Sequence, residues 1–180
     1  MSYLARFPLG LVMAVCAAAI CGCHETLRYS GDGQLTDNGP FASTDRYVLN
    51  LGPIDFTERG KRAFRIVNLP PANYVVGIEI STAPEDRASI EGRLISPVIR
   101  LSLSDAGGKV LFAHDSALDT WTWSVKSPGT QAFVYERGEP GTYFSAAPRA
   151  EYALTLTVIK PDSRPVKYAA HLVATSGGWK

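Results

Sequence analysis

Histidine is the side chain best suited to acid–base catalysis near neutral pH, and this sequence contains three histidines. His24 lies near the N-terminus, so His114 and His171 are the histidines available to a folded active site. His114 opens the run His114-Asp115-Ser116, which holds the three residue types of a nucleophilic triad. Triads are assembled from separate elements, however, and neighbouring residues of a strand point to opposite faces. The run therefore indicates polar residues at the end of a strand, and we predict that the protein is not an enzyme.

Acidic residues offer two further kinds of chemistry, calcium binding and glycosidic cleavage. Asp105, Asp115 and Asp119 are close in the sequence, but they match no recognised calcium loop, and aspartate is common in turns. The carboxylates between Glu79 and Glu91 could include an acid/base pair, which needs a separation of about 5 to 9.5 Å. A solvated loop is the simpler explanation of these acids. The sequence thus predicts no metal site and no cofactor.

The most distinctive aromatic residues are Trp121 and Trp123, which are spaced by two and so share one face of a strand. Tyr135 and Tyr143 fall on strands that could be neighbours. An exposed face of this kind would form a stacking platform for sugar rings or for a partner protein. Polar residues alternate with the tryptophans over 120–124, however, and they form a natural outward set. We therefore favour a place in the core for both tryptophans and keep the platform as the alternative.

The elements that must position these residues show an apolar period of two, which is the signature of strands. The runs with this pattern are 47–51, 64–67, 74–81, 99–104, 110–113, 121–126, 133–135, 143–144, 152–159 and 168–174. Gly, Pro, Asn and Asp separate them, and no convincing amphipathic helix of ordinary length occurs. This predicts an all-β fold, an antiparallel β-sandwich of jelly-roll or immunoglobulin-like type, over residues 45–180.

Two long loops of this sandwich are the expected carriers of any binding function, because binding sites are often built on loops. The first is the charged segment 82–94, which has room for a short helical turn. The second is the segment 126–140.

The N-terminus has the features of an export signal. Arg6 is followed by a largely apolar run over 7–20, and no acidic residue occurs before Glu25. The run is shorter than the roughly 20 residues that a membrane-spanning helix needs. It suits the apolar region of a signal peptide, which we place at 1–22.

The motif at the end of this segment is Ile20-Cys21-Gly22-Cys23. It resembles the lipobox of bacterial lipoproteins, with Gly22 and Cys23 at the two most restrictive positions. Ile20 is an aliphatic replacement, and Cys21 departs from the usual Ala or Ser but is small. The resemblance implies cleavage between Gly22 and Cys23, with diacylglycerol on the Cys23 thiol and a fatty acyl chain such as palmitate on the new amino group. The bilayer is then a partner of the chain through the acyl chains of Cys23.

An ordinary secretory signal, cut after Ala18 or Ala19, is the alternative to a lipoprotein signal. It would leave Cys23 as a free thiol in an oxidising compartment, which is a liability. Zinc binding by the three cysteines is disfavoured, because the apolar surroundings of Cys16, Cys21 and Cys23 supply no fourth ligand.

The residue after the lipidated cysteine is His24. In Gram-negative lipoproteins, Asp at this place usually signals retention in the inner membrane, so the resemblance implies the outer membrane, facing the periplasm. Residues 23–44 are rich in Gly, Ser, Thr, Asp and Asn, and we expect them to form a lipidated flexible tether before the domain.

Composition and charge limit the function classes. Hydrophobic residues make up 46% of the chain and charged residues 19%, which is typical of a folded domain. The net charge of +1 and the scattered cations argue against a nucleic-acid partner.

These features predict a membrane-anchored envelope lipoprotein that binds another envelope or periplasmic protein. Its layout resembles small sandwich lipoproteins that support secretion machinery or neutralise toxins, although this is a likeness of fold only. Binding would use edge strands or end loops. The alternative is a carbohydrate or peptidoglycan-binding module that uses the aromatic face, and a hydrolase ranks third.

Overall fold

The computed structural model describes residues 28–40, 46–126, 128–139, 141–164 and 167–176. The predicted signal peptide, its cleavage position at Gly22 and Cys23, and the lipidated Cys23 itself all lie outside the described residues. Within the described ranges, none of the helices is long and apolar enough to cross a membrane.

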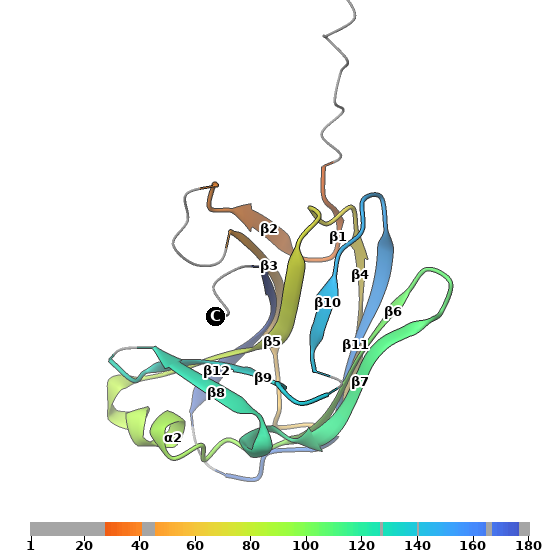
Figure 1. The fold of residues 1–180 in the computed structure, drawn as a ribbon. Coiled ribbons are helices and arrows are strands. Elements are labelled where there is room, and N and C mark those ends of the chain that lie inside the picture. The colour runs from red at the N-terminus through yellow and green to blue at the C-terminus, as the bar shows by residue number, and fades with distance from the viewer. Residues whose placement is uncertain (1–27, 41–45, 127, 140, 165–166, 177–180) are drawn as a thin grey trace, which may run out of the picture.

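Two antiparallel sheets packed against each other make up the domain (Figure 1). The five-stranded sheet has the order β1 (Ser30–Gly31), β4 (Gly60–Val67), β11 (Glu151–Lys160), β6 (Val98–Asp105) and β7 (Val110–Ala117). The seven-stranded sheet has the order β2 (Gln34–Asp37), β3 (Tyr47–Ile54), β12 (Tyr168–Ser176), β5 (Asn73–Thr82), β9 (Gln131–Tyr135) and β8 (Thr122–Lys126), with β10 (Tyr143–Ser145) beside β5. The predicted all-β antiparallel sandwich is confirmed.

The helical elements are short and lie in the connections. They are η1 (Pro84–Asp86), α2 (Arg87–Glu91) and η2 (Leu118–Thr120). The first two fall in the segment 82–94, where the sequence left room for a helical turn.

The core forms where the alternating apolar residues of the two sheets meet. On β5 the inward residues Tyr74, Val76, Ile78 and Ile80 are fully buried, as their period of two predicts. The facing layer of the other sheet is supplied by β4, β11, β6 and β7 through Phe64, Ile66, Tyr152, Leu154, Leu156, Val158, Ile99, Leu101, Leu103 and Phe112. One continuous apolar cluster therefore fills the space between the sheets.

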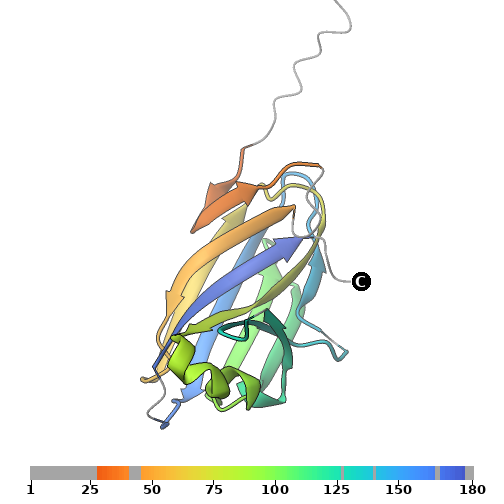
Figure 2. The ribbon, with the colours of Figure 1, turned by 90° about the vertical axis from the view of Figure 1, so that its left-hand side faces the viewer.

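The outer face of the seven-stranded sheet carries a second, smaller apolar cluster of Val75, Phe133, Tyr135 and Val173. Figure 2 looks onto this sheet, with β3, β12 and β5 side by side and α2 at the lower end. Gly77 makes room for it, because a Cβ atom there would lie 2.6 Å from the Phe133 ring and 2.5 Å from the Val134 carbonyl oxygen. Glycine in the middle of this strand thus allows an aromatic ring to lie directly on the backbone.

The N-terminal segment differs from the predicted tether 23–44, because Ser30–Gly31 and Gln34–Asp37 are strands of the domain and not a flexible spacer. β1 pairs with the end of β4, and β2 pairs with the first half of β3. Between them the chain crosses from one sheet to the other at Gly33, whose φ of +84° and close approach to Asn50 O leave no room for a side chain. The segment therefore joins the edges of both sheets, and the domain begins well before residue 45.

Candidate functional site

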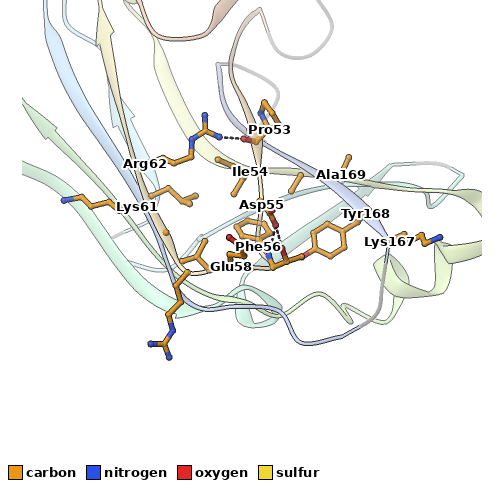
Figure 3. A pocket seen from close by; sticks show the side chains of 16 residues that line it. Pro53, Ile54, Asp55, Phe56, Glu58, Lys61, Arg62, Lys167, Tyr168 and Ala169 are labelled. Carbon is orange, nitrogen blue, oxygen red and sulfur yellow. Dashed lines mark hydrogen bonds between the residues drawn. The ribbon is translucent and has the colours of Figure 1, made fainter.

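A cleft of about 630 Å³ opens between β3 and β4, on the side of the sandwich where the short strands β2 and β1 are outermost (Figure 3). The N-terminal segment covers only one half of this side. β2 pairs with β3 up to Asn50, and β1 pairs with β4 only at Ile66 and Val67. Beyond these points no described strand lies between the two edges, and the cleft occupies that space. Its volume is within the range of about 300–1,000 Å³ that is usual for ligand sites.

The floor of the cleft belongs to the core. Ile54 and Phe56 enter from β3 and the loop that follows it, and Leu156, Val158 and Ala170 enter from β11 and β12. All five are buried. A ligand that reaches this floor would therefore bury apolar surface, which is favourable at about 25 cal/mol per Å².

The rim of the cleft is basic. Four cations border it: Arg59, Lys61, Arg62 and Lys167. The acids are Asp55 and Glu58, so the cations exceed them by two charges. Lys61 and Lys167 extend to opposite sides of the cleft in Figure 3. The rim therefore favours a ligand with negative charge.

Asp55 contributes to the shape of the rim more than to its binding chemistry. Its carboxylate accepts hydrogen bonds from the backbone N–H and the hydroxyl of Thr57, at 2.8 and 2.6 Å. The side-chain hydrogen bond from Thr57, together with the backbone one, lowers the pKa of Asp55. These bonds fix the turn after β3, which brings Phe56 into the core.

Arg62 crosses from β4 to β3 at one wall of the cleft. Its guanidinium donates a hydrogen bond to the carbonyl of Pro53 and lies 5.2 Å from the centre of the Phe64 ring (Figure 3). Pro53 has no N–H to offer, so this part of β3 has little free hydrogen-bonding capacity.

The wall at the start of β12 is formed by Tyr168. Its ring lies 6.4 Å from that of Phe56, at an angle of 37°. Its hydroxyl is buried beside the carboxylate of Asp162. Burial raises the pKa of Tyr168 well above its usual value, and the negative charge of Asp162 adds to this effect.

We predict that ionisation of tyrosines with raised pKa values destabilises this fold at alkaline pH. Burial raises the pKa of Tyr29 to about 12 and shifts the pKa values of Tyr74 and Tyr168 upward as well. A raised pKa in the folded state contributes stability below the unfolded pKa of about 10, and this stability is lost as the pH rises through the folded value. We expect the free energy of unfolding in urea to fall between about pH 10 and pH 12.

Absorbance at 295 nm checks this prediction, since it follows tyrosinate formation directly. A Tyr168→Phe variant should lose less stability over the same pH interval than the parent protein does. If every tyrosine of the folded domain titrated near pH 10, the buried environment assigned to these three hydroxyls would be wrong.

The four aromatic residues considered for ligand binding do not form an exposed platform. Trp121 and Trp123 are 1% and 8% exposed and belong to the core. Their indole N–H groups donate to the Ser116 hydroxyl at 2.6 Å and to the Leu118 carbonyl at 3.1 Å. The preferred interpretation of the tryptophans as core residues is thus confirmed, and the exposed platform is wrong for this pair because both indoles are buried.

The two tyrosines of that set lie elsewhere. Tyr135 is buried in the outer cluster, where it stacks on Phe133 at 5.6 Å. Tyr143 meets the edge of Tyr135 at 6.2 Å and is 40% exposed, the most exposed of the four.

The run His114-Asp115-Ser116 diverges, as the alternation of a strand requires. Asp115 forms an ion pair with Arg100 on the outside of the sheet, whereas Ser116 accepts the Trp121 indole N–H. His114 lies edge-on to Trp121, with 6.4 Å between the rings. His171 is in the other sheet, on β12, so the structure does not bring the two histidines together.

The carboxylates considered for calcium do not converge either. Asp105 accepts the Lys109 N–H in a turn, and Asp119 accepts the Ser96 hydroxyl at 2.6 Å. The described ranges contain no group of three His, Cys, Asp or Glu residues placed to hold a metal ion. Of the acids near the segment 82–94, Glu79 pairs with Lys126 and Glu91 with Arg87.

Sequence reasoning directed attention to two other loops and missed this cleft. The available signal was the group of cations at 59, 61, 62 and 65. Arg59 directly precedes β4, and Lys61, Arg62 and Arg65 lie within it. Phe64 is the first large apolar side chain of this strand, so the apolar period shows only its end. No protein-family model matches the chain, and a search of curated proteins finds no similar sequence.

Proposed function

We propose that this chain is a lipid-anchored envelope protein, held at the outer membrane by Cys23, whose β-sandwich binds another protein through the cleft between β3 and β4. The motif Ile20-Cys21-Gly22-Cys23 supports the anchor. The observation that carries the binding function is the cleft itself, where a buried apolar floor lies under a basic rim on a side that the N-terminal segment leaves open.

The position of the anchor suits this function. Residues 24–29 separate Cys23 from β1 and can span at most about 25 Å. β1 pairs with the Val67 end of β4, which lies near the upper end of the domain in Figure 1. The cleft lies at the Gly60 end of β4, about 24 Å farther along the strand. Anchoring through Cys23 would thus hold β1 near the bilayer and leave the cleft accessible in the periplasm.

Site-specific photocrosslinking in cells tests the binding function. A photoreactive residue at position 61, on the rim, should crosslink a discrete partner protein. The matched control is position 110 on β7, at the opposite edge of the five-stranded sheet, where Val110 is also exposed. A photoreactive residue at this position should not crosslink the partner. Charge reversal of Arg59 and Lys61 to glutamate should reduce the crosslink several-fold without changing the thermal midpoint. Equal crosslinking at both positions, or none at 61, would contradict the proposal.

A further inference from the structure

We infer that the cleft takes an extended, acidic segment of the partner protein, which adds as a new strand to the free edge of β4. This inference rests on the proposed function, because it states how the partner of that cleft is recognised.

β4 is paired on one side only along most of its length. Its register with β11 is continuous from Gly60 to Val67. On the other side, β1 is aligned with Val67 and Ile66, and Asp32 continues the contact to Arg65. From 60 to 64 no described strand lies against this edge. An edge of this kind is a template for strand addition.

The hydrogen bonds of Arg65 show which backbone groups are free. Its N–H donates to the Asp32 carboxylate at 2.6 Å, and its carbonyl accepts the Asp32 N–H at 2.8 Å. Both groups of Arg65 therefore point away from β11. Because the peptide groups of an antiparallel strand alternate in direction, those of Ala63 and Lys61 point to the same open side. Ala63 and Lys61 thus offer two backbone N–H donors and two carbonyl acceptors to an incoming strand.

The edge of β3 on the other side of the cleft cannot pair with a new strand. The register of β3 with β12 shifts between Gly52 and Asn50, which marks a bulge. Pro53 follows without an N–H, and Arg62 occupies its carbonyl. Only the β4 edge of the cleft is therefore open for backbone pairing.

The surroundings of this edge define the chemistry of the segment. Phe64 and Ile66 point into the core from β4, so alternate side chains of a strand beside it would point to the floor of Phe56, Leu156 and Val158. The remaining side chains would lie on the outer face of the strand, which carries Lys61 of the rim. An extended segment that alternates apolar and acidic residues meets both requirements, and electrostatic attraction would also speed its association.

A synthetic peptide of alternating valine and glutamate, capped at both ends, is the probe for this inference. Added to the full chain in detergent, it should slow amide hydrogen exchange at Ala63 and Lys61. A peptide of alternating valine and lysine should bind at least about tenfold more weakly, because its charges oppose those of the rim. In a Lys61→Glu variant, the affinities of the two peptides should lie closer together.

Two changes test the backbone pairing directly. Ala63→Pro removes an N–H that β11 does not use, and it should weaken binding of the valine–glutamate peptide at least about tenfold, whereas Ala63→Val, which keeps the N–H, should bind like the parent. Because the proline variant could fail to fold, a second probe carries N-methyl groups on the peptide at the positions that face β4. This N-methylated peptide should bind the unaltered protein as weakly as the unmodified peptide binds the Ala63→Pro variant.

The outcomes separate this inference from the proposed function. If N-methylation leaves peptide affinity unchanged, or if protection appears on β7 instead of β4, strand addition is overturned. The crosslink at position 61 could then still occur, and the partner would bind the cleft in another way. If that crosslink also fails, the proposed function is wrong together with the inference.

Discussion

The Cys23→Ser variant is expected to move almost completely from the membrane fraction to the soluble fraction, whereas the parent protein stays in the pellet after a high-salt wash. The proposed lipoprotein motif implies several fatty acyl chains on residue 23, and each buried methylene contributes about 0.8 kcal/mol to membrane binding. Serine offers no thiol for the diacylglycerol transfer. Cell fractionation followed by immunoblotting measures the distribution, and incorporation of labelled palmitate should be seen for the parent only.

Cys21→Ser is the matched control, because it changes a neighbouring thiol and brings the motif closer to the usual lipobox pattern. This variant should remain in the membrane fraction and take up label. The lipoprotein assignment is wrong if Cys23→Ser still sediments with membranes and the parent takes up no fatty acid.

Replacing Trp121 by alanine is expected to lower the free energy of unfolding by about 3–5 kcal/mol, the usual cost of removing a large aromatic side chain from a core. Trp121 is among the largest fully buried side chains of the domain. Its loss would leave a cavity beside His114 and free the Ser116 hydroxyl from its 2.6 Å hydrogen bond. Urea denaturation followed by far-ultraviolet circular dichroism measures the change.

Two variants separate the contributions at this position. Ser116→Ala removes the acceptor of the indole N–H and keeps the ring, so we expect a loss of about 1 kcal/mol. Val110→Ala on the same strand alters a side chain that is 58% exposed, and its effect should stay within about 0.5 kcal/mol. A Trp121→Ala variant as stable as Val110→Ala would mean that the indole is not a core residue.

The strands that form the centre of the sandwich were predictable because their burial is regular. β11 alternates strictly over most of its length, and the structure buries its predicted face. On β5 the predicted face is also buried, although the second cluster covers part of its outer face as well. The tryptophans were assigned correctly for a similar reason, since polar residues flank them at every second position. Local periodicity is sufficient where a strand has one face in the core and one in solvent.

The edges of the sheets were not predictable in this way. β1 and β2 are short and mostly exposed, so their pairing leaves little trace in hydrophobicity, and residues 30–37 resemble a linker. The first half of β4 carries exposed charges and gives no apolar period. The cleft exists because the segment 30–37 covers the sides of β3 and β4 only in part. This is a property of tertiary structure that a local apolar period does not show.

The position of β1 and β2 has a mechanical consequence for a protein fixed to a surface by its N-terminus. A tension applied through that end reaches β1 first, because it is the first strand of the described chain. Strand β1 has only two residues, so it would peel from β4 at a lower force than the central strands need to separate. Its removal would free the peptide groups of Val67, and those of Arg65 as well once Asp32 followed. Under the proposed function, a pull on the anchor would thereby lengthen the edge of β4 that is open to a partner strand.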